Sequence, residues 1–407
     1  MAKVIFLNRY FFPDHSATSQ LLSAIAFALA AVGHDVHVIT SQQLYDEPNT
    51  RLPPEEMASA VKIHRVRTTR FGRTSLLGRS IDYVAFFFSV RRILTFLASA
   101  NDIVIAKTDP PLLSLAVLPV VKRRGARLVN WLQDLYPEIA IASGMYWLRG
   151  PIGGGLAFLR DRSLKAACAN VVVGALMAER LVSKQVRRET IHLIPNFAID
   201  DEIVPVSAAD NPLRRDWELG DKFVIGYSGN LGRVHEFQTI LDAAEHLRNE
   251  PRIVFLCVGG GRLFDVLARS VGERKLEDKF VFRPYQDRAT LKYSLSAPDV
   301  HWISLRPEFE GLVVPSKVYG IAAAGRPIIA ITAKSGEIAR LVHTHRCGIV
   351  VEPGDAQRLA ATLSELMVNP SLCAEMGSRA RTMLEKNYTR AHAFELWQQL
   401  LRDVRLE

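Results

Sequence analysis

The feature that most constrains the fold is a repeated alternation of short apolar strands and helix-like segments along the chain of 407 residues. Strands of four to six residues separated by helices predict parallel sheets that are covered by helices on both faces. In the first half, the predicted strands are Lys3–Asn8, His34–Thr40, Ile103–Lys107, Arg127–Leu132, Asn170–Val173 and Ile191–Asn196, with helices predicted at 18–32 and 112–122.

The second half repeats the pattern after a segment rich in Asp, Ala and Pro, Asp200–Asp221, which predicts a linker. Its predicted strands are Phe223–Tyr227, Ile253–Val258, Phe280–Phe282, Val300–Ile303, Pro327–Ile331 and Gly348–Val351. The predicted helices are 236–248, 262–271, 287–296, 315–324, 335–343, 355–368 and 371–386.

A chain of this length exceeds one ordinary core. We therefore predict an α/β protein with two doubly wound, Rossmann-like domains, at 1–198 and 213–387. A last helix, within 388–407, carries Phe394, Trp397 and Leu400–Leu401 on one face, which predicts packing back onto the first domain. Open α/β sheets bind ligands beyond the carboxyl ends of their strands, so two such domains predict a ligand in a central cleft.

Composition narrows the class of protein. Apolar residues make up 48% and charged residues 23% of the chain, as is typical of globular proteins. The four cysteines are scattered and form no C-x-x-C pair, which favours buried thiols in a reducing compartment over a disulfide framework or a zinc site. The first residues form no signal peptide, and no apolar run reaches the roughly 18 residues that span a bilayer. We expect a cytoplasmic protein, soluble or peripheral at a membrane, with no metal and no cofactor.

The net charge of +9 is unevenly distributed. Residues 1–198 contain 24 Lys and Arg against 14 Asp and Glu, whereas residues 199–407 contain 27 against 28. Apolar positions 81, 84, 85 and 88 follow helical spacing among these cations, which fits either an interfacial helix on an anionic membrane or a core-packed helix with a solvated basic face. Nucleic acid is the least favoured partner because no recognition module is visible. The basic residues concerned are Lys62, Arg65, Arg67, Arg70, Arg73, Arg79, Arg91, Arg92 and Lys122–Arg124.

Two strand ends in the first half carry candidate ligand-binding residues. Asp14, His15 and the small residues Ser16 and Ala17 follow the first strand, where they either leave helix N–H groups open to a ligand or provide an N-cap. Asp134 follows Arg127–Leu132, with Tyr136 and Glu138 close behind. An aspartate in this position either accepts a proton from a hydroxyl group or caps the next helix.

The second half places candidate phosphate ligands after its strands. A glycine-bearing turn with Gly229 and Asn230 lets backbone N–H groups approach a phosphate, with Arg233 and His235 as nearby cations; a tight turn without a ligand is the alternative. Further along the chain come the open loop at Gly259 and Gly260, and then Arg283 and Tyr285, which suit the edge and face of a base.

The segment 306–320 carries the strongest local signal. Glu308 and Glu310 lie in a loop with Gly311, and a helix predicted to begin near Pro315 has Ser316 and Lys317 in its first turn. A lysine at this end opposes the helix dipole, so a bound phosphate explains Lys317 better than a structural role does.

Taken together, the motifs WLQDLYPE (131–138), YSGNLG (227–232), GGG (259–261) and PSKVYG followed by AAGRP (315–327) resemble family 4 of the glycosyltransferases, in particular bacterial enzymes of colanic acid and O-antigen assembly. The resemblance implies the GT-B fold and metal-independent transfer with retention of configuration. By position, Asn230 replaces a common Arg and His235 a common Lys of the diphosphate site. Where the family often has two glutamates, this chain has Leu312 and Gly320 instead. Where the family often has a small Gly-Gly loop, this chain has Ser16–Ala17.

The resemblance predicts a UDP-sugar donor and a lipid-linked glycan acceptor, such as a polyprenyl-diphosphate-linked sugar at the inner face of the plasma membrane. In this interpretation Lys317 and Arg233 stabilise the leaving diphosphate, and Asp134 takes the proton of the acceptor hydroxyl. The expected donor-binding residues are Ser16, Ala17, Gly229, Asn230, Arg233, His235, Gly259, Gly260, Arg283, Tyr285, Glu310, Gly311, Leu312, Val313, Val314, Ser316 and Lys317. Two alternatives are a nucleotide-sugar epimerase of the same architecture and a nucleotide-sugar-binding protein without activity.

Overall fold

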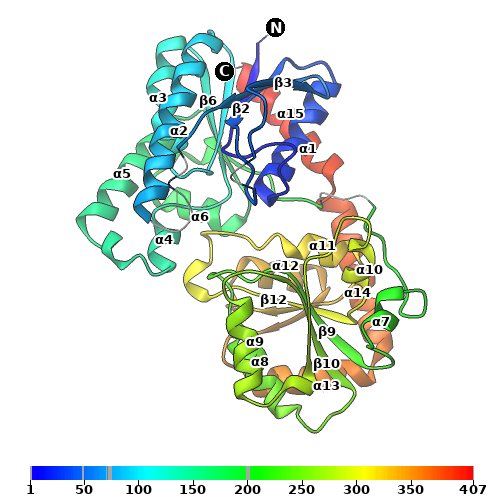
Figure 1. The fold of residues 1–407 in the computed structure, drawn as a ribbon. Helices are drawn as coiled ribbons and strands as arrows, with labels where there is room; N and C mark the ends of the chain where they lie inside the picture. Colours follow the sequence, from blue (N-terminus) through cyan, green and yellow to red (C-terminus); the bar gives the residue numbers. More distant parts are fainter. Residues whose placement is uncertain (1, 48–49, 70, 72–75, 199–201, 407) are drawn as a thin grey trace. The chain divides into compact units, whose positions relative to one another are not determined.

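The computed structural model describes residues 2–47, 50–69, 71, 76–198 and 202–406, and the chain divides into two compact units (Figure 1). The first unit contains 1–199, 311–313 and 390–407, and the second contains 200–310 and 314–389. Arg70 and Arg73 of the basic segment lie outside the described residues. Each unit is a mostly parallel sheet with helices on both faces, which confirms the predicted fold class.

The sheet of the first unit runs in the order β3-β4-β2-β1-β5-β6-β7-β8, and its pairings are parallel except for the edge hairpin β3–β4. The chain winds outward in opposite directions from β1 and β5, so the topological switch point lies between these two strands. The strands are β1 (Val4–Leu7), β2 (Val36–Ser41), β3 (Glu55–Ala58), β4 (Val61–Val66), β5 (Ile103–Lys107), β6 (Arg127–Leu132), β7 (Ala169–Val172) and β8 (Ile191–Leu193).

Alternate residues of β1 enter two different cores, as a strand buried on both faces requires. Val4 and Phe6 pack in the cluster with α1 and α15, whereas Ile5 and Leu7 pack in the cluster with α2 and α3. The helices of this unit are α1 (Ala17–Ala31), α2 (Leu76–Leu97), α3 (Leu113–Arg124), α4 (Glu138–Ala142), η1 (Tyr146–Leu148), α5 (Pro151–Ala166), α6 (Ala175–Ser183), η2 (Arg188–Thr190) and α15 (Arg390–Leu406).

The C-terminal helix α15 packs on the first unit, beside α1, as its apolar face predicts (Figure 1). The indole of Trp397 is fully buried, with its ring centroid 4.6 Å from that of Trp131 and 6.4 Å from that of Phe6. The last residues of the chain therefore complete the core of its first domain.

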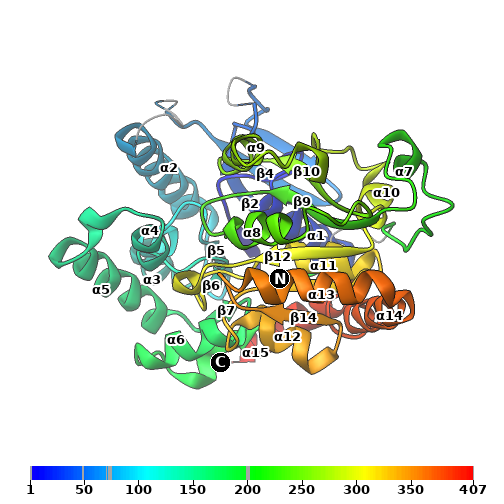
Figure 2. The ribbon, with the colours of Figure 1, turned by 90° about the horizontal axis from the view of Figure 1, so that it is seen from below.

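The second unit has a parallel sheet in the order β11-β10-β9-β12-β13-β14, with its switch point between β9 and β12. Its strands are β9 (Phe223–Asn230), β10 (Ile253–Gly260), β11 (Phe280–Arg283), β12 (Val300–Ser304), β13 (Ile328–Ile331) and β14 (Gly348–Val351). Its helices are α7 (Pro212–Asp216), α8 (Gln238–His246), α9 (Phe264–Glu273), η3 (Glu277–Lys279), α10 (Leu291–Ser296), η4 (Pro307–Phe309), α11 (Lys317–Ala323), α12 (Glu337–His345), α13 (Ala356–Val368) and α14 (Pro370–Asn387). Helices α13 and α14 lie side by side, and they also pack on α8 and α11, respectively (Figure 2).

Several elements differ from the sequence-based expectation. The hairpin β3–β4 and the helix α5 were not predicted, and α11 begins at Lys317 rather than near Pro315. Strands β9 and β10 continue through Gly229–Asn230 and Gly259–Gly260, which pair with each other, so the turn expected at Gly229 begins only after the strand. No helix in the described parts of the chain has both the length and the apolar character needed to cross a bilayer.

Candidate active site

The loops that follow β9 and β12 meet at the switch point of the second unit, where doubly wound sheets bind their ligands. The Arg306 N–H donates to the carbonyl of Val234 at 3.0 Å, and the Glu236 N–H donates to the hydroxyl of Ser304 at 3.0 Å. The imidazole Nδ1 of His235 lies 2.7 Å from the carbonyl oxygen of Ser304. These contacts hold the two loops together as one structure.

His235 and Lys317 form a hydrogen-bonded pair in this structure. Because a carbonyl oxygen only accepts, Nδ1 of His235 carries the hydrogen that Ser304 receives, and Nε2 is left as an acceptor. The ammonium of Lys317 lies 3.0 Å from Nε2 and donates to it. His235 is only 4% exposed, and burial together with the Lys317 charge lowers its pKa to about 3. The expectation that His235 serves as a cation is therefore wrong: it is a neutral group that orients Lys317.

Lys317 is the cation of this cluster. Burial lowers the pKa of its half-buried ammonium to about 8, so the group is still mostly charged at neutral pH. The ammonium lies 5.4 Å from the centroid of the Tyr227 ring. Within the described residues no carboxylate pairs with it. A partly desolvated cation without a paired anion indicates a binding site for a negatively charged ligand.

Two glycines allow the strand ends to approach this cluster. Gly229 has a φ of +123°, and a Cβ placed there would lie 3.0 Å from Cε of Lys317. Gly259, its partner on β10, has a φ of +133°, and a Cβ there would lie 2.3 Å from the carbonyl oxygen of Gly229. The structure thus brings together three of the predicted donor-site residues: Gly229, His235 and Lys317.

The other predicted residues of the second unit fall into separate places. Arg233 is exposed, two residues before His235 in the same loop. Asn230 lies against Gly261, whose hypothetical Cβ would be 2.0 Å from Oδ1 of that asparagine. The exposed ring of Tyr285 lies against Gly260, and the Arg283 guanidinium lies 5.9 Å from the ring of Trp217.

The carboxylate of Glu310 lies at the start of α12. It accepts hydrogen bonds from the hydroxyl of Thr332 and, at 3.2 Å, from the N–H of Glu337. A Cβ on Gly336 would lie 2.2 Å from this carboxylate, so the glycine makes room for it. Glu310 therefore has a structural role at a helix N-terminus, where a negative charge is favourable.

The residues that follow Glu310 do not lie together in one site. Gly311–Val313 belong to the first unit, in which Val313 forms an isolated β-bridge with Asp134 and the Leu312 carbonyl accepts from the Leu135 N–H at 3.0 Å. Val314 is buried, and Ser316 is the exposed residue before α11, without a capping hydrogen bond from its side chain.

A second cluster lies at the switch point of the first unit. The Arg9 N–H, after β1, donates to the Asp109 carbonyl, after β5, at 2.8 Å. Lys107, only 2% exposed, donates from its ammonium to the Thr18 carbonyl at 2.9 Å and lies 4.0 Å from the centroid of the Trp131 ring. Asp109 and Asp134 are both half-buried just beyond the ends of β5 and β6.

The three ionisable groups of this cluster all titrate close to neutral pH. Burial raises the pKa of Asp109 to about 6, and burial together with the charge of Asp109 raises the pKa of Asp134 to about 6. Burial lowers the pKa of Lys107 to about 7. Groups that titrate near neutrality are suited to general acid–base chemistry. The sequence predicted Asp134 but missed Asp109 and Lys107, although both stand at the end of a predicted strand.

The remaining acceptor-side residues have local roles. The Asp14 carboxylate accepts from the N–H and hydroxyl of Ser16 and from the N–H of Tyr45, which orders the loop before α1. Ser16 occupies the N-cap position of α1 but makes no capping bond, and Ala17 is the first helical residue. His15 is exposed, and its carbonyl accepts from the side chain of a residue in the first turns of α1, Gln20.

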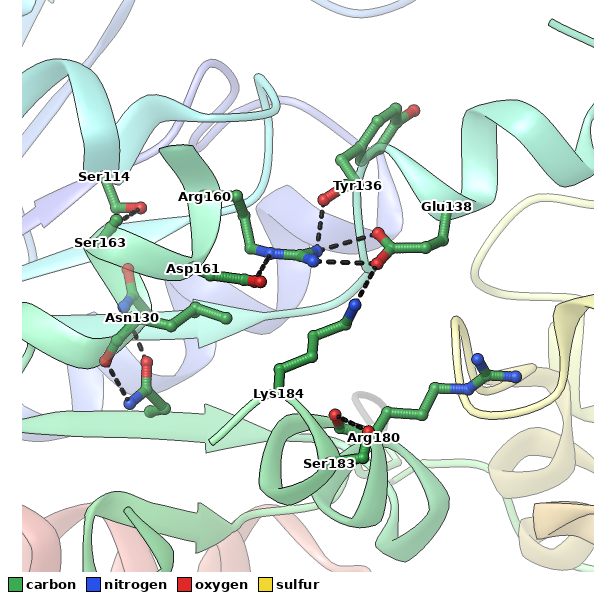
Figure 3. Close-up of polar contacts among 12 residues, drawn as sticks. Ser114, Asn130, Tyr136, Glu138, Arg160, Asp161, Ser163, Arg180, Ser183 and Lys184 are labelled. Atoms are coloured by element: carbon green, nitrogen blue, oxygen red, sulfur yellow. Dashed lines mark hydrogen bonds and ion pairs between the residues drawn. The ribbon is translucent and has the colours of Figure 1, made fainter. Parts of the chain in front are cut away.

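Glu138 is the centre of an ion cluster, in which Arg160 and Lys184 converge on its carboxylate (Figure 3). Arg160 donates to both carboxylate oxygens, at 2.9 and 3.0 Å, and Lys184 lies 2.8 Å away. Burial alone would raise the pKa of Glu138, but these hydrogen bonds and charges outweigh it and hold the pKa at about 2. Arg160 also donates to the carbonyl of Tyr136, whose own phenol has a pKa raised by burial. Glu138 is thus a fixed anion that ties α4 to α5.

No grouping of three or more His, Cys, Asp or Glu side chains in the described chain is arranged to hold a metal ion. Apart from the ion cluster at Glu138, polar residues converge at each of the two switch points. We refer to them as the Lys317 cluster (Gly229, His235 and Lys317) and the Asp134 cluster (Lys107, Asp109 and Asp134).

Comparison with known proteins identifies both halves of the chain. Residues 18–196 match the family described as Glycosyl transferase 4-like domain, and residues 210–383 match Glycosyl transferases group 1. The chain is 30% identical over 342 residues to the probable glycosyltransferase WbjE of Pseudomonas aeruginosa, which covers 83% of each protein. It is 25% identical over 388 residues to the putative colanic acid biosynthesis glycosyl transferase WcaI of Escherichia coli, which covers 90% of this chain and 93% of that one.

Two solved structures share the fold at low sequence identity. Sucrose-phosphate synthase from Thermosynechococcus elongatus superposes with a TM-score of 0.80 at 17% identity over 99% of each chain. Anabaena Alr3699/HepE, in complex with UDP-glucose, superposes with a TM-score of 0.72 at 16% identity over 98% of this chain and 99% of that one.

Proposed function

Because the chain belongs to family 4 of the glycosyltransferases, with the GT-B fold, we propose that it transfers a sugar from a UDP-sugar to a lipid-linked glycan during cell-surface polysaccharide assembly. The proposal includes retention of anomeric configuration and independence of metal ions. The colanic acid biosynthesis in the name of WcaI and the UDP-glucose bound by Alr3699/HepE support the pathway class and the donor.

The observation that carries the proposal is the Lys317 cluster. It offers a partly desolvated ammonium at the switch point of the second unit, oriented by His235 and approached closely by the backbone at Gly229. A nucleoside diphosphate supplies the anion that this ammonium lacks. As the bond between the sugar and the diphosphate breaks, its electron pair leaves with the phosphate oxygen, where Lys317 stabilises the developing charge.

The Asp134 cluster is the proposed acceptor side. The acceptor hydroxyl forms its new bond to the anomeric carbon and gives up its proton to Asp134, which then releases the proton to water. The pKa of about 6 keeps most of this carboxylate ionised at pH 7 and still basic enough to take a proton.

A donor screen tests this function first. UDP-sugars should raise the melting temperature of the full chain more than GDP-, CMP- or dTDP-sugars do, by mass action on the folded state. Transfer to a polyprenyl-diphosphate-linked sugar should then release UDP, persist in a chelator, and give a product whose anomeric proton coupling reports retention. Inversion, or dependence on added metal, would refute those parts of the proposal.

The same experiment separates the alternatives. An epimerase would convert the sugar donor in the absence of any acceptor, and a binding protein would be stabilised by the donor without turnover. If either result is observed and UDP release does not depend on an acceptor, the transferase proposal is refuted in favour of that alternative.

The proposal extends to an anionic membrane surface for α2. Phe86 and Val90 of this helix face the core, whereas Leu77, Val84 and Phe88 point outward, with Leu77 74% and Phe88 67% exposed. Of the two interpretations of this stretch, the exposed apolar face therefore fits the interfacial helix. Exposed cations such as Arg92 on the same helix suit anionic headgroups.

Other exposed aromatic residues of the first unit have the same character. Tyr146 and Trp147 of η1 are 60% and 59% exposed, and Phe158 of α5 is 64% exposed. The Arg149 guanidinium lies 4.3 Å from the ring centroid of Tyr146. Aromatic residues beside cations are typical of surfaces that rest at the level of lipid headgroups.

Co-sedimentation with vesicles tests the membrane surface. The full chain should bind vesicles that contain phosphatidylserine, more weakly as salt is added, and Phe88→Glu or Phe158→Glu should reduce binding severalfold. Val32→Glu, at an exposed apolar residue after α1, is the matched control and should bind normally. No binding at low salt, or equal loss in the control, would refute this surface.

A further inference from the structure

Resting on the proposed function, we propose that Asp109 is a positioning residue of the acceptor side, which shares a proton with Asp134 and, with Lys107 as the common counter-charge, sets how tightly Asp134 holds the proton taken from the acceptor. The proton acceptor of this enzyme is then a pair of carboxyl groups rather than a single aspartate.

The backbone places the two aspartates on neighbouring strand ends. Strands β5 and β6 are adjacent and in register, with Lys107 opposite Trp131, and each aspartate stands just beyond the end of its strand. The Gln133 N–H donates to the hydroxyl of Thr108 at 3.1 Å, which joins the two strand-end loops next to the aspartates. The contact from Arg9 to the Asp109 carbonyl fixes the same loop from the β1 side.

The aspartates of this pair differ from other half-buried and buried aspartates of the unit. Asp14, Asp82 and Asp102 each accept hydrogen bonds from backbone or side-chain donors. For Asp109 and Asp134, by contrast, no donor to the carboxylate is found in the described part of the chain. A carboxylate that is partly desolvated and not hydrogen-bonded is destabilised in its charged form, so it is available to take up a proton.

Lys107 supplies a positive charge that acts on both aspartates, whereas Arg9 acts on Asp109. Its ammonium is buried on Trp131 and bonded to the Thr18 carbonyl, so it cannot move away from the pair. Its charge lowers the pKa of both aspartates. The other charged or titratable groups around the pair come from α2 and from the loops that follow β1, β2 and β6: Arg79, Tyr83, Arg9, Asp14, Tyr45 and Tyr136.

The pair has a definite proton cycle. Burial raises both pKa values to about 6, which is still below neutral pH, so both carboxylates are mostly ionised at pH 7. The O–H bond of the acceptor breaks as its oxygen bonds to the anomeric carbon, and the proton binds the Asp134 carboxylate. When this proton is shared between Asp109 and Asp134, the pair carries one negative charge. Release of the proton to water restores the starting state.

The sign of each perturbation follows from these charges. Asp109→Asn removes a neighbouring negative charge, so the pKa of Asp134 should fall and the acid limb of kcat/KM for the acceptor should move to lower pH, by about one unit. Lys107→Met removes a positive charge, so the same limb should move to higher pH. A residue with only a structural role would not shift the limb in opposite directions in these two variants.

The experiment is a pH profile of transfer by the full chain, with Asp210→Asn, an exposed aspartate of the second unit, as the control without a shift. In parallel, carboxyl ¹³C NMR of the substrate-free protein labelled at aspartate measures the titration directly. The expected result is two coupled carboxyl groups that titrate well above pH 4 in the unaltered protein, and one such group in Asp109→Asn.

Three results would overturn the inference: an unchanged acid limb in Asp109→Asn, shifts in the same direction in both variants, or two carboxyl groups that titrate independently near pH 4. If Asp109→Asn does not fold, the titration of the unaltered protein still decides. Failure of the proposed function is a separate result, since unaltered protein that releases no UDP from any donor leaves the NMR titration fully informative.

Discussion

Lys317 gives the most quantitative prediction because its charge is both partly buried and titratable. The fall of its pKa from 10.5 to about 8 corresponds to a desolvation cost of about 3 kcal/mol. A phosphate oxygen about 4 Å from the ammonium returns about 4 kcal/mol per unit charge at the effective dielectric of a protein site. The ammonium is therefore preorganised to bind an anion. Its removal should mainly slow the step in which the diphosphate leaves the sugar.

We expect Lys317→Ala to lower kcat/KM for the donor by about 10²- to 10³-fold, the usual effect of removing one preorganised electrostatic contact. In the unaltered enzyme, kcat/KM should stay level between about pH 7 and about pH 8 and fall about tenfold per unit above it, as the ammonium of the free enzyme loses its proton. Lys317→Arg keeps its charge throughout this range, so its residual activity should show no such alkaline limb.

The assay is UDP release measured from about pH 6 to about pH 10, with donor varied at saturating acceptor. Lys334→Ala, at an exposed lysine paired with Glu352, is the matched control in the same unit and should keep normal kinetics. Lys317→Ala with activity within about threefold of the unaltered enzyme, or an alkaline limb that persists in Lys317→Arg, would refute the reasoning.

Three further predictions concern single side chains. His235→Ala leaves Lys317 without its orienting acceptor, so the Kd for UDP should rise about tenfold by calorimetry, and the melting temperature should fall because the bond to the Ser304 carbonyl is lost as well. Trp397→Ala opens a cavity in the first unit, and urea unfolding should show a loss of about 3–5 kcal/mol; a loss below about 1 kcal/mol would contradict the packing of α15. Glu138→Gln should be less stable than the unaltered protein by up to about 3 kcal/mol at neutral pH, because the folded pKa of about 2 lies below the ordinary 4.5. This difference should be complete above pH 4.5 and disappear as pH falls towards 2, and a difference independent of pH would contradict it.

The sequence predicted the central strands well because their hydrophobic runs are buried on both faces of a parallel sheet. The hairpin β3–β4 was missed although Val61 and Ile63 alternate with Lys62 and His64, the pattern of a half-buried strand. Its charges were interpreted as a basic surface, and a strand such as β4, with one face exposed, has both features.

The helix α5 escaped prediction for a tertiary reason. It contains Gly153–Gly155, which disfavour a helix in isolation. A Cβ on Gly153 would lie 1.8 Å from the carbonyl oxygen of Leu148, so this glycine permits the close approach of η1 to α5. Close packing of this kind cannot be read from local propensity.

The site was predictable where a single residue violated a local rule, as Lys317 does at the start of a helix. The protonation state of His235 could not be predicted, because it depends on the carbonyl of Ser304, which is far away in sequence. Asp109 was predictable in principle, since it follows a strand as Asp134 does, but its significance rests on the adjacency of β5 and β6.

The central claim is that a nucleoside diphosphate binds at Lys317 and His235. Calorimetric titration of UDP into the full chain near pH 8, repeated in buffers of different ionisation enthalpy, tests it most directly. Binding should be accompanied by uptake of a fraction of a proton, because the bound phosphates raise the pKa of Lys317, and Lys317→Ala should lose both this uptake and about 100-fold in affinity. UDP that binds the two proteins equally, with the same proton balance, would contradict the account.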